Sequence, residues 1–291
     1  MSNNTRKSRL LRLFLRRNFA TLTVLPLLLV LVVYACIIEP NSLAVNTHTF
    51  EHPAISANIN GTTVVFVSDL HVRTRDLPKL EKLVDEINKL KPDLILLGGD
   101  FVNGSGECAS ASELVARLQK LSAPLGVYAV PGNHEYRRNI EEIFNAFGNS
   151  HIKMLPDHNV LLQTANGGVI NLVGLDYQTN PHRRQDSKRL EKLFSKEHFN
   201  LVLTHTPEDF EYLSDQAHLV LAGHTHGGQI TIPLLGSVIN PYFGRKLNYG
   251  WKKSGNKTMF VSCGINSAYQ TARLGMKPEI VVIKLQSAGK N

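Results

Sequence analysis

The stretch Leu219-Val-Leu-Ala-Gly-His-Thr-His-Gly-Gly-Gln229 joins an apolar run to a pair of histidines among glycines. The apolar residues 219–222 are typical of a short buried strand. His224 and His226 follow it one residue apart, and Gly223 and the glycines after His226 let the loop turn sharply. Neutral imidazoles bind transition-metal ions, and side chains two apart on an extended loop can point into one small volume. The pattern favours a metal site, whereas a loop histidine pair taken alone is more often solvated or packed.

The same design recurs at four earlier points along the chain. Apolar runs end at polar blocks, namely Asp69-Leu-His71, Gly98-Gly-Asp100, Gly132-Asn-His-Glu135 and the single His205. Taken separately, Asp100 could be a turn residue, and Asp69 or Asn133 could be helix N-caps. Separate explanations do not account for five strand ends that share one ligand chemistry. Because ligands of open α/β sheets bind beyond the carboxyl ends of strands, we expect one common site.

The predicted ligands define the chemistry of that site. Mixed Asp, Asn and His without a thiolate suits Mn, Fe, Zn or a similar divalent ion. Eight candidate side chains exceed the needs of one ion, so two ions that share a bridging carboxylate are implied. Two ions roughly 3.5–4 Å apart can turn a bridging water into hydroxide and neutralise charge on a phosphoryl group. The chain has no G-x-S-x-G elbow and no P-loop, which argues against a serine hydrolase and an NTPase.

These five blocks resemble, in identity and order, the signature of the calcineurin-like metallophosphoesterase superfamily: D-x-H, G-D, G-N-H-E, a lone H and G-H-x-H. The match spans residues 62 to about 285. The Gly-His-Thr-His-Gly-Gly-Gln ending and the apolar N-terminal segment most resemble the bacterial membrane-associated phosphodiesterase branch. The resemblance implies a two-sheet sandwich flanked by helices, the four-layer αββα arrangement, with a dinuclear centre at the strand ends.

The resemblance also implies a role for each residue. It divides the ligands into two sets with a shared carboxylate: Asp69, His71 and His226 for one ion, Asn133, His205 and His224 for the other, and Asp100 as the bridge. His134 would be catalytic instead, facing the phosphate to stabilise the transition state or to protonate the leaving oxygen. Glu135 could orient His134 or lie at the surface.

Hydrophobic periodicity gives the fold class independently of that resemblance. From Thr62 onward, β-branched runs alternate with helical patterns around residues 80–90, 114–121 and 140–147. Strands continue after the helical patterns thin out, which indicates an α/β protein with packed sheets and outer helices. The expected strands are 63–68, 93–97, 126–130, 169–174, 200–204, 218–222, 258–262 and 279–284.

The N-terminal region carries most of the formal net charge of +8, because six basic residues precede the first acidic one. The remainder is nearly balanced, which argues against nucleic-acid binding. Residues 19–38 contain no charge and are long enough to span a hydrocarbon core of roughly 30 Å. The positive-inside rule then places residues 1–18 in the cytoplasm and the rest outside it, in a single-pass protein of the cytoplasmic membrane. A cleaved signal peptide, or a lipoprotein signal ending at Cys36, is the alternative.

Residues 39–60 are expected to be a linker, and residues 61–291 the metallophosphoesterase domain. Between Pro233 and Trp251 no strand or helix period is present, and this stretch could be a substrate-binding lip or a solvated loop. Tyr242, Arg245 and Lys246 are its candidate substrate-binding residues, with Arg245 or Lys246 in contact with a phosphate. Cys108 and Cys263 lie too far apart in sequence to predict a disulfide.

The sequence thus predicts a membrane-anchored phosphodiesterase with two divalent metal ions and a phosphoester substrate. One alternative is a pyrophosphatase that splits UDP-2,3-diacylglucosamine, although that substrate is made in the cytoplasm and conflicts with the predicted topology. Another is a membrane scaffold that keeps the fold without catalysis. Oligomeric state is not indicated by any pattern in the chain.

Overall fold

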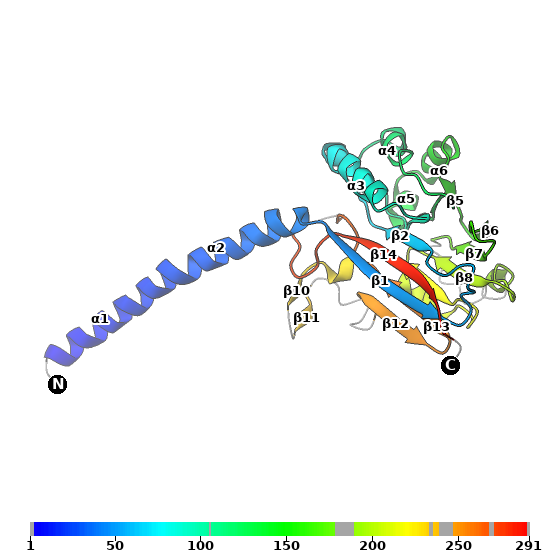
Figure 1. The fold of residues 1–291 in the computed structure, drawn as a ribbon. Helices are drawn as coiled ribbons and strands as arrows, with labels where there is room; N and C mark the ends of the chain where they lie inside the picture. The colour runs from blue at the N-terminus through cyan, green and yellow to red at the C-terminus, as the bar shows by residue number, and fades with distance from the viewer. Residues whose placement is uncertain are drawn as a thin grey trace.

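The computed structural model describes residues 3–104, 106–177, 189–232, 235–238, 247–267 and 271–289. Two six-stranded sheets pack face to face, and a long helix leaves the domain at one side (Figure 1). The first sheet has the order β1-β14-β2-β3-β4-β5 and the second β12-β13-β9-β8-β7-β6. The strands are β1 (Ala44–His52), β2 (Thr63–Val67), β3 (Leu94–Leu97), β4 (Val127–Ala129), β5 (Lys153–Met154), β6 (His158–Gln163), β7 (Val169–Gly174), β8 (Phe199–Leu203), β9 (Leu219–Ala222), β12 (Gly250–Ser254), β13 (Lys257–Val261) and β14 (Glu279–Ser287), with a small hairpin of β10 (Thr231–Ile232) and β11 (Gly236–Ser237).

The central strands are buried on both faces, which explains their continuous apolar runs. Side chains alternate along a strand, so Val64 and Phe66 of β2 enter the core between the sheets while Val65 and Val67 face the helices. The neighbours β2, β3, β4 and β5 are parallel, as are β7, β8, β9 and β13. Within each parallel set, the loops that follow the strands therefore leave from the same end of the sheet.

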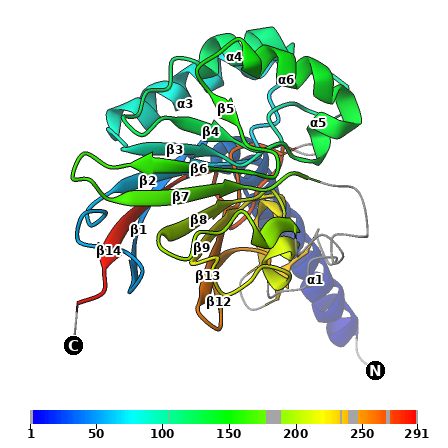
Figure 2. The same ribbon diagram turned by 90° about the vertical axis from the view of Figure 1, so that its right-hand side faces the viewer.

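Helices cover the outer face of the first sheet (Figure 2). These are α3 (Leu77–Lys89), α4 (Ala111–Leu118) and α6 (Ile140–Gly148), each with one apolar stripe on the sheet, and the short α5 (Asn133–Arg138) follows β4. The outer face of the second sheet is covered by Phe194 and by the 3₁₀ helix η5 (Pro207–Glu211), with Phe210 buried against β8 and β9. The predicted sandwich of two sheets flanked by helices is confirmed.

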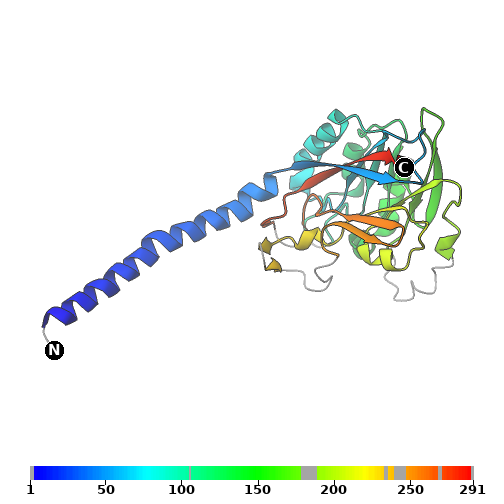
Figure 3. The same ribbon diagram turned by 60° about the horizontal axis from the view of Figure 1, so that its bottom comes forward.

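The N-terminal segment is one helical run composed of α1 (Asn3–Phe19), a π-helical stretch (Ala20–Val24), α2 (Leu25–Val33), a second π-helical stretch (Tyr34–Ile38) and a 3₁₀ turn (Glu39–Asn41). It projects away from the domain (Figure 3). Residues 7–41 are long and apolar enough to cross a membrane, and Leu22 and Leu29 are 76% and 64% exposed. Such exposed apolar surface agrees with the predicted span at 19–38.

Residues 39–60 were expected to be a linker, but residues 44–52 form β1. This strand pairs in parallel with β14, from Ala44 beside Glu279 to His52 beside Ser287. β1 lies at the edge of the sheet, and Phe50 is its one buried side chain, so no apolar run marks it in the sequence. The chain therefore enters the domain directly after the helix. The edge strands β6 and β12 escaped prediction for the same reason.

Candidate metal centre

The carboxyl ends of β2, β3, β4, β8 and β9 converge at one end of the sandwich. Segments that follow these strands bring six of the seven predicted ligands, together with His134, into three overlapping groups: Asp69–His71–His226, His71–Asp100–His134 and Asp100–His205–His224. The seventh predicted ligand, Asn133, lies beside His205. In each group, ligand atoms lie within 4.8 Å of one another. The structure therefore joins side chains from five strand ends in one place, together with His134.

Backbone strain is concentrated in these loops. Five of the candidate ligands have a positive φ that non-glycine residues rarely adopt: Asp69 (57°), His71 (37°), Asp100 (52°), His224 (71°) and His226 (52°). Such residues cost about 1–3 kcal/mol each and cluster at functional sites. The glycines permit the crowding, because a Cβ on Gly132 would lie 2.2 Å from Oδ1 of Asp100, and one on Gly223 2.4 Å from Oδ2 of Asp69.

The first ligand set gathers around Oδ1 of Asp69. This oxygen lies 3.6 Å from Nε2 of His226 and 3.9 Å from Nε2 of His71. The two Nε2 atoms are 3.3 Å apart. The backbone N–H of His224 donates to the Asp69 carboxylate, at 3.0 Å from Oδ2, and so fixes its orientation.

The second ligand set gathers around His205. Its Nδ1–H donates to the carbonyl oxygen of Gly98 at 2.7 Å, which leaves the lone pair of Nε2 directed into the centre. That Nε2 lies 3.1 Å from Nδ1 of His224 and 3.2 Å from Oδ1 of Asn133.

Asp100 lies between the two sets. Its Oδ2 is 3.3 Å from Nε2 of His205 and 3.5 Å from Nε2 of His71, while its Oδ1 accepts from the backbone N–H of His134 at 2.8 Å. One oxygen of a single carboxylate thus faces ligands of both sets.

His134 carries its proton on the opposite side from His205. The backbone N–H of Gly104 donates to Nδ1 of His134 at 2.6 Å, so in the neutral ring the proton is on Nε2. This Nε2 lies 3.9 Å from Oδ2 of Asp100 and faces the centre. A ring with N–H pointing inward is a proton donor in this position, whereas His205 presents a lone pair.

Glu135 has a different role from either of those expected for it. It is fully buried, and its carboxylate accepts backbone N–H groups from both sides of the site: Gly132 at 2.7 Å, Phe101 at 2.8 Å, Asp100 at 2.9 Å and Val102 at 3.3 Å. Burial, reinforced by the charge of Asp100, raises the pKa of Glu135 to about 7. The residue therefore holds the Asp100 loop against the start of α5. Glu135 is the third helical residue after the N-cap Gly132 and accepts its backbone N–H, but glycine has no side chain for a capping box, so the sequence carries no such signal.

The electrostatics of the centre favour bound cations. Burial lowers the pKa of His71 and of His224 to about 3, so both rings are neutral and can coordinate. Burial also opposes charge on His205, yet the negative field of Asp100 and Asp69 raises its pKa to about 10. The donor atoms are carboxylate oxygens, an amide oxygen and imidazole nitrogens, which are ligands that divalent ions accept.

Aromatic side chains form part of the surroundings and were not predicted. The ring of Tyr177 lies 6.0 Å from that of His205 and 6.2 Å from that of His224. The hydroxyl of Tyr136 donates to Asp176 at 2.6 Å. Asp176 follows the end of β7 as the other polar residues follow their strands, so the same pattern could have identified it. The predicted substrate-binding residues lie outside the described residues: Tyr242, Arg245 and Lys246.

Comparison with known proteins agrees with this geometry. Residues 62–228 match the model of the calcineurin-like phosphoesterase family. The chain belongs to this family. Accordingly, it is a hydrolase of phosphoesters, in a family that uses divalent metals.

Three relatives illustrate the range of the family. The chain is 29% identical to the uncharacterized metallophosphoesterase YkuE of Bacillus subtilis, over 87% of this chain and 89% of the relative. It is 25% identical to the UDP-2,3-diacylglucosamine pyrophosphatase LpxG of Chlamydia muridarum, over 87% of this chain and 92% of the relative. A bovine transmembrane protein with a metallophosphoesterase domain is 28% identical, over 79% of this chain and 54% of that protein.

Proposed function

We propose that the protein is a phosphodiesterase with a dinuclear metal centre, anchored in the membrane by its N-terminal helix. The observation that carries the proposal is the position of Asp100, whose Oδ2 faces His71 of one ligand set and His205 of the other. Asp69, His71 and His226 would hold one ion, and Asn133, His205 and His224 the other. Manganese, iron and zinc all suit this donor set.

Two divalent ions would activate the attacking water and neutralise the charge of the phosphoryl group. His134 donates the proton on Nε2 toward the oxygen of the leaving group. Its Nδ1 is held by the N–H of Gly104, which fixes both the tautomer and the direction of that proton. Glu135 keeps the Asp100 loop in register with His134, and Tyr177 provides an aromatic wall beside the substrate.

The position of the helix supports a substrate at the membrane surface. The start of β1 and the end of β2 lie at the same end of the sheet, because β14 between them is parallel to β1 and antiparallel to β2. The helix therefore joins the domain at the same end as the metal centre. The basic residues before the helix favour a domain on the extracytoplasmic side. A reporter fused after Asn291 tests this, and activity of the reporter only in the cytoplasm would reverse the orientation.

A second candidate is cleavage of UDP-2,3-diacylglucosamine, which similarity to the chlamydial pyrophosphatase favours.

The deciding experiment uses the purified full chain in detergent with manganese. We expect hydrolysis of bis-p-nitrophenyl phosphate, two bound ions per chain and loss of activity with EDTA. Asp100→Asn should lower the rate on the order of 10³-fold or more. If only UDP-2,3-diacylglucosamine is cleaved, the pyrophosphatase hypothesis replaces the phosphodiesterase hypothesis. If neither substrate is cleaved and no metal binds, the scaffold alternative replaces both.

A further inference from the structure

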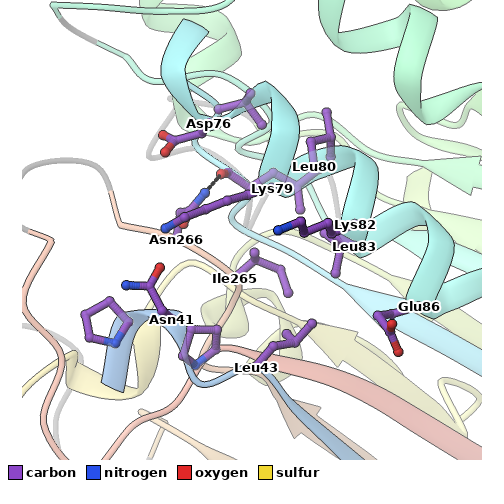
Figure 4. A pocket seen from close by; sticks show the side chains of 14 residues that line it. Asn41, Leu43, Asp76, Lys79, Leu80, Lys82, Leu83, Glu86, Ile265 and Asn266 are labelled. Carbon is purple, nitrogen blue, oxygen red and sulfur yellow. Dashed lines mark hydrogen bonds between the residues drawn. The ribbon is translucent and has the colours of Figure 1, made fainter. Parts of the chain in front are cut away.

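A cavity of about 390 Å³ lies where the N-terminal helix meets the domain (Figure 4). Pro40 and Asn41, at the end of the helix, form one wall, together with Leu43. Helix α3 forms the opposite wall, and Ile265 and Asn266 lie between them. This volume is within the range of protein sites for small organic ligands.

The cavity is separate from the metal centre although both use the segment after β2. Asp69 and His71 of this segment point into the metal centre, whereas Leu70 and Val72 line the cavity. Leu80 and Leu83 of α3 extend the apolar surface. The wall is thus suited to a hydrocarbon chain.

Positive charge lies along the α3 side of the cavity. Lys79 and Lys82 are exposed there, and the lining also includes Asp76 and Glu86. Both acids have basic partners, Arg73 at 3.5 Å for Asp76 and Lys89 at 2.7 Å for Glu86. Among the described residues, no carboxylate forms a salt bridge with Lys79 or Lys82. The two ammonium groups therefore remain available to an anionic ligand.

The cavity lies close to the predicted membrane surface. The last turns of the helix are docked on the domain, since Ala35 is buried and its carbonyl oxygen accepts the backbone N–H of Arg273 at 2.8 Å. The exposed apolar residues of the helix extend to Ile38, two residues before Pro40 of the cavity wall. A second cavity of about 340 Å³ shares Asn41 and Lys79 with the first and reaches back to Cys36 of the helix. The combined cavities thus extend toward the bilayer.

We propose that this cavity binds one anionic phospholipid from the leaflet that the helix enters. The phosphate group meets Lys79 and Lys82, and the upper part of an acyl chain lies on Leu43, Leu70 and Leu83. The cavity has an apolar wall, a basic side and a position at the end of the helix. These three features together favour a lipid over a soluble anion as the ligand. The proposal is independent of the hydrolysis proposed above, because the lipid site and the metal centre lie on opposite sides of residues 69–72.

The test is lipid binding by the full chain in detergent, followed by native mass spectrometry. Phosphatidylglycerol and phosphatidylcholine with the same acyl chains are titrated separately. We expect tight binding of one phosphatidylglycerol, and binding weakened roughly tenfold or more in the double variant Lys79→Gln, Lys82→Gln. The matched control is Lys252→Gln, Lys253→Gln on β12, which removes the same charge elsewhere and should bind as the wild type does.

Two further variants separate the causes. Leu43→Asn should weaken phosphatidylglycerol binding without loss of the metals, since it polarises the apolar wall. Asp100→Asn should keep wild-type lipid binding while hydrolysis is lost, so that failure of one proposal is distinguishable from failure of the other. The lipid site is refuted if the Lys79/Lys82 variant binds as tightly as its control, if phosphatidylcholine binds equally well, or if no lipid is retained.

Discussion

Strands β8 and β9 carry histidines at both ends, and the two ends behave differently. At the carboxyl ends, His205 and His224 lie among carboxylates in the metal centre. At the amino ends, the ring of His218 stacks on Phe199 at 5.7 Å and lies 4.8 Å from the ring of His52. Nδ1 of His218 accepts the backbone N–H of Asn200 at 3.0 Å.

The difference teaches that neighbours, and not residue type, decide what a histidine does. Burial opposes protonation at both ends. Next to Asp100 and Asp69 the pKa of His205 nevertheless rises to about 10, whereas burial and the nearby His52 lower that of His218 to about 4. The negative field that favours a proton on Nε2 of His205 also favours a divalent cation there, which would replace that proton and bind the Nε2 lone pair. The aromatic end instead stabilises a neutral ring and has a structural role.

The largest effect is expected from replacing His134, which lies in the metal centre. His134→Asn should lower kcat for bis-p-nitrophenyl phosphate by roughly 10²–10⁴-fold, because the proton on Nε2 is lost. Two metal ions per chain should remain, since the tautomer of His134 presents no lone pair to the centre. Kinetics at saturating manganese and elemental analysis measure both. His218→Gln is the control and should keep wild-type kcat. Loss of metal together with activity would make His134 a ligand instead.

A smaller effect is expected from Glu135, which acts on the ligands through the backbone. Glu135→Gln removes a charged acceptor from the N–H groups of Gly132, Asp100 and Phe101. Affinity for manganese should fall about 10–100-fold, as for other residues that orient ligands. Titration calorimetry of the metal-free protein measures it. Glu141→Gln, an exposed glutamate of α6, should have no effect. Equal affinities for the two variants would show that Glu135 does not position the loop.

The sequence predicted most of the centre because each ligand follows an apolar run, and parallel strands bring such ends together. It predicted β2, β3, β8 and β9 for the same reason, as strands buried on both faces are continuously apolar. It missed β1, whose exposed face is polar, and so placed a strand of the sheet in a linker. The role of Glu135 was also missed, because its partners are backbone N–H groups that no side-chain pattern reports.

The smallest expected effect is on the pH dependence of stability, and it comes from His218 at the amino end of β9. In the unfolded chain His218 titrates near 6.5, and in the folded protein near 4. Between these values the unfolded state binds more protons, so the contribution of His218 to stability is complete above pH 6.5 and is lost as the pH falls toward 4. His218→Gln removes this titration and should flatten the pH dependence of stability by up to about one proton.

Urea unfolding of the metal-free full chain between pH 4 and pH 7 measures the slope. Because the metals are absent and the other histidines are common to both proteins, the difference between wild type and variant belongs to His218. Identical slopes would mean that the ring is protonated in the folded state as readily as in the unfolded chain, and the contrast between the two ends of β8 and β9 would then be lost.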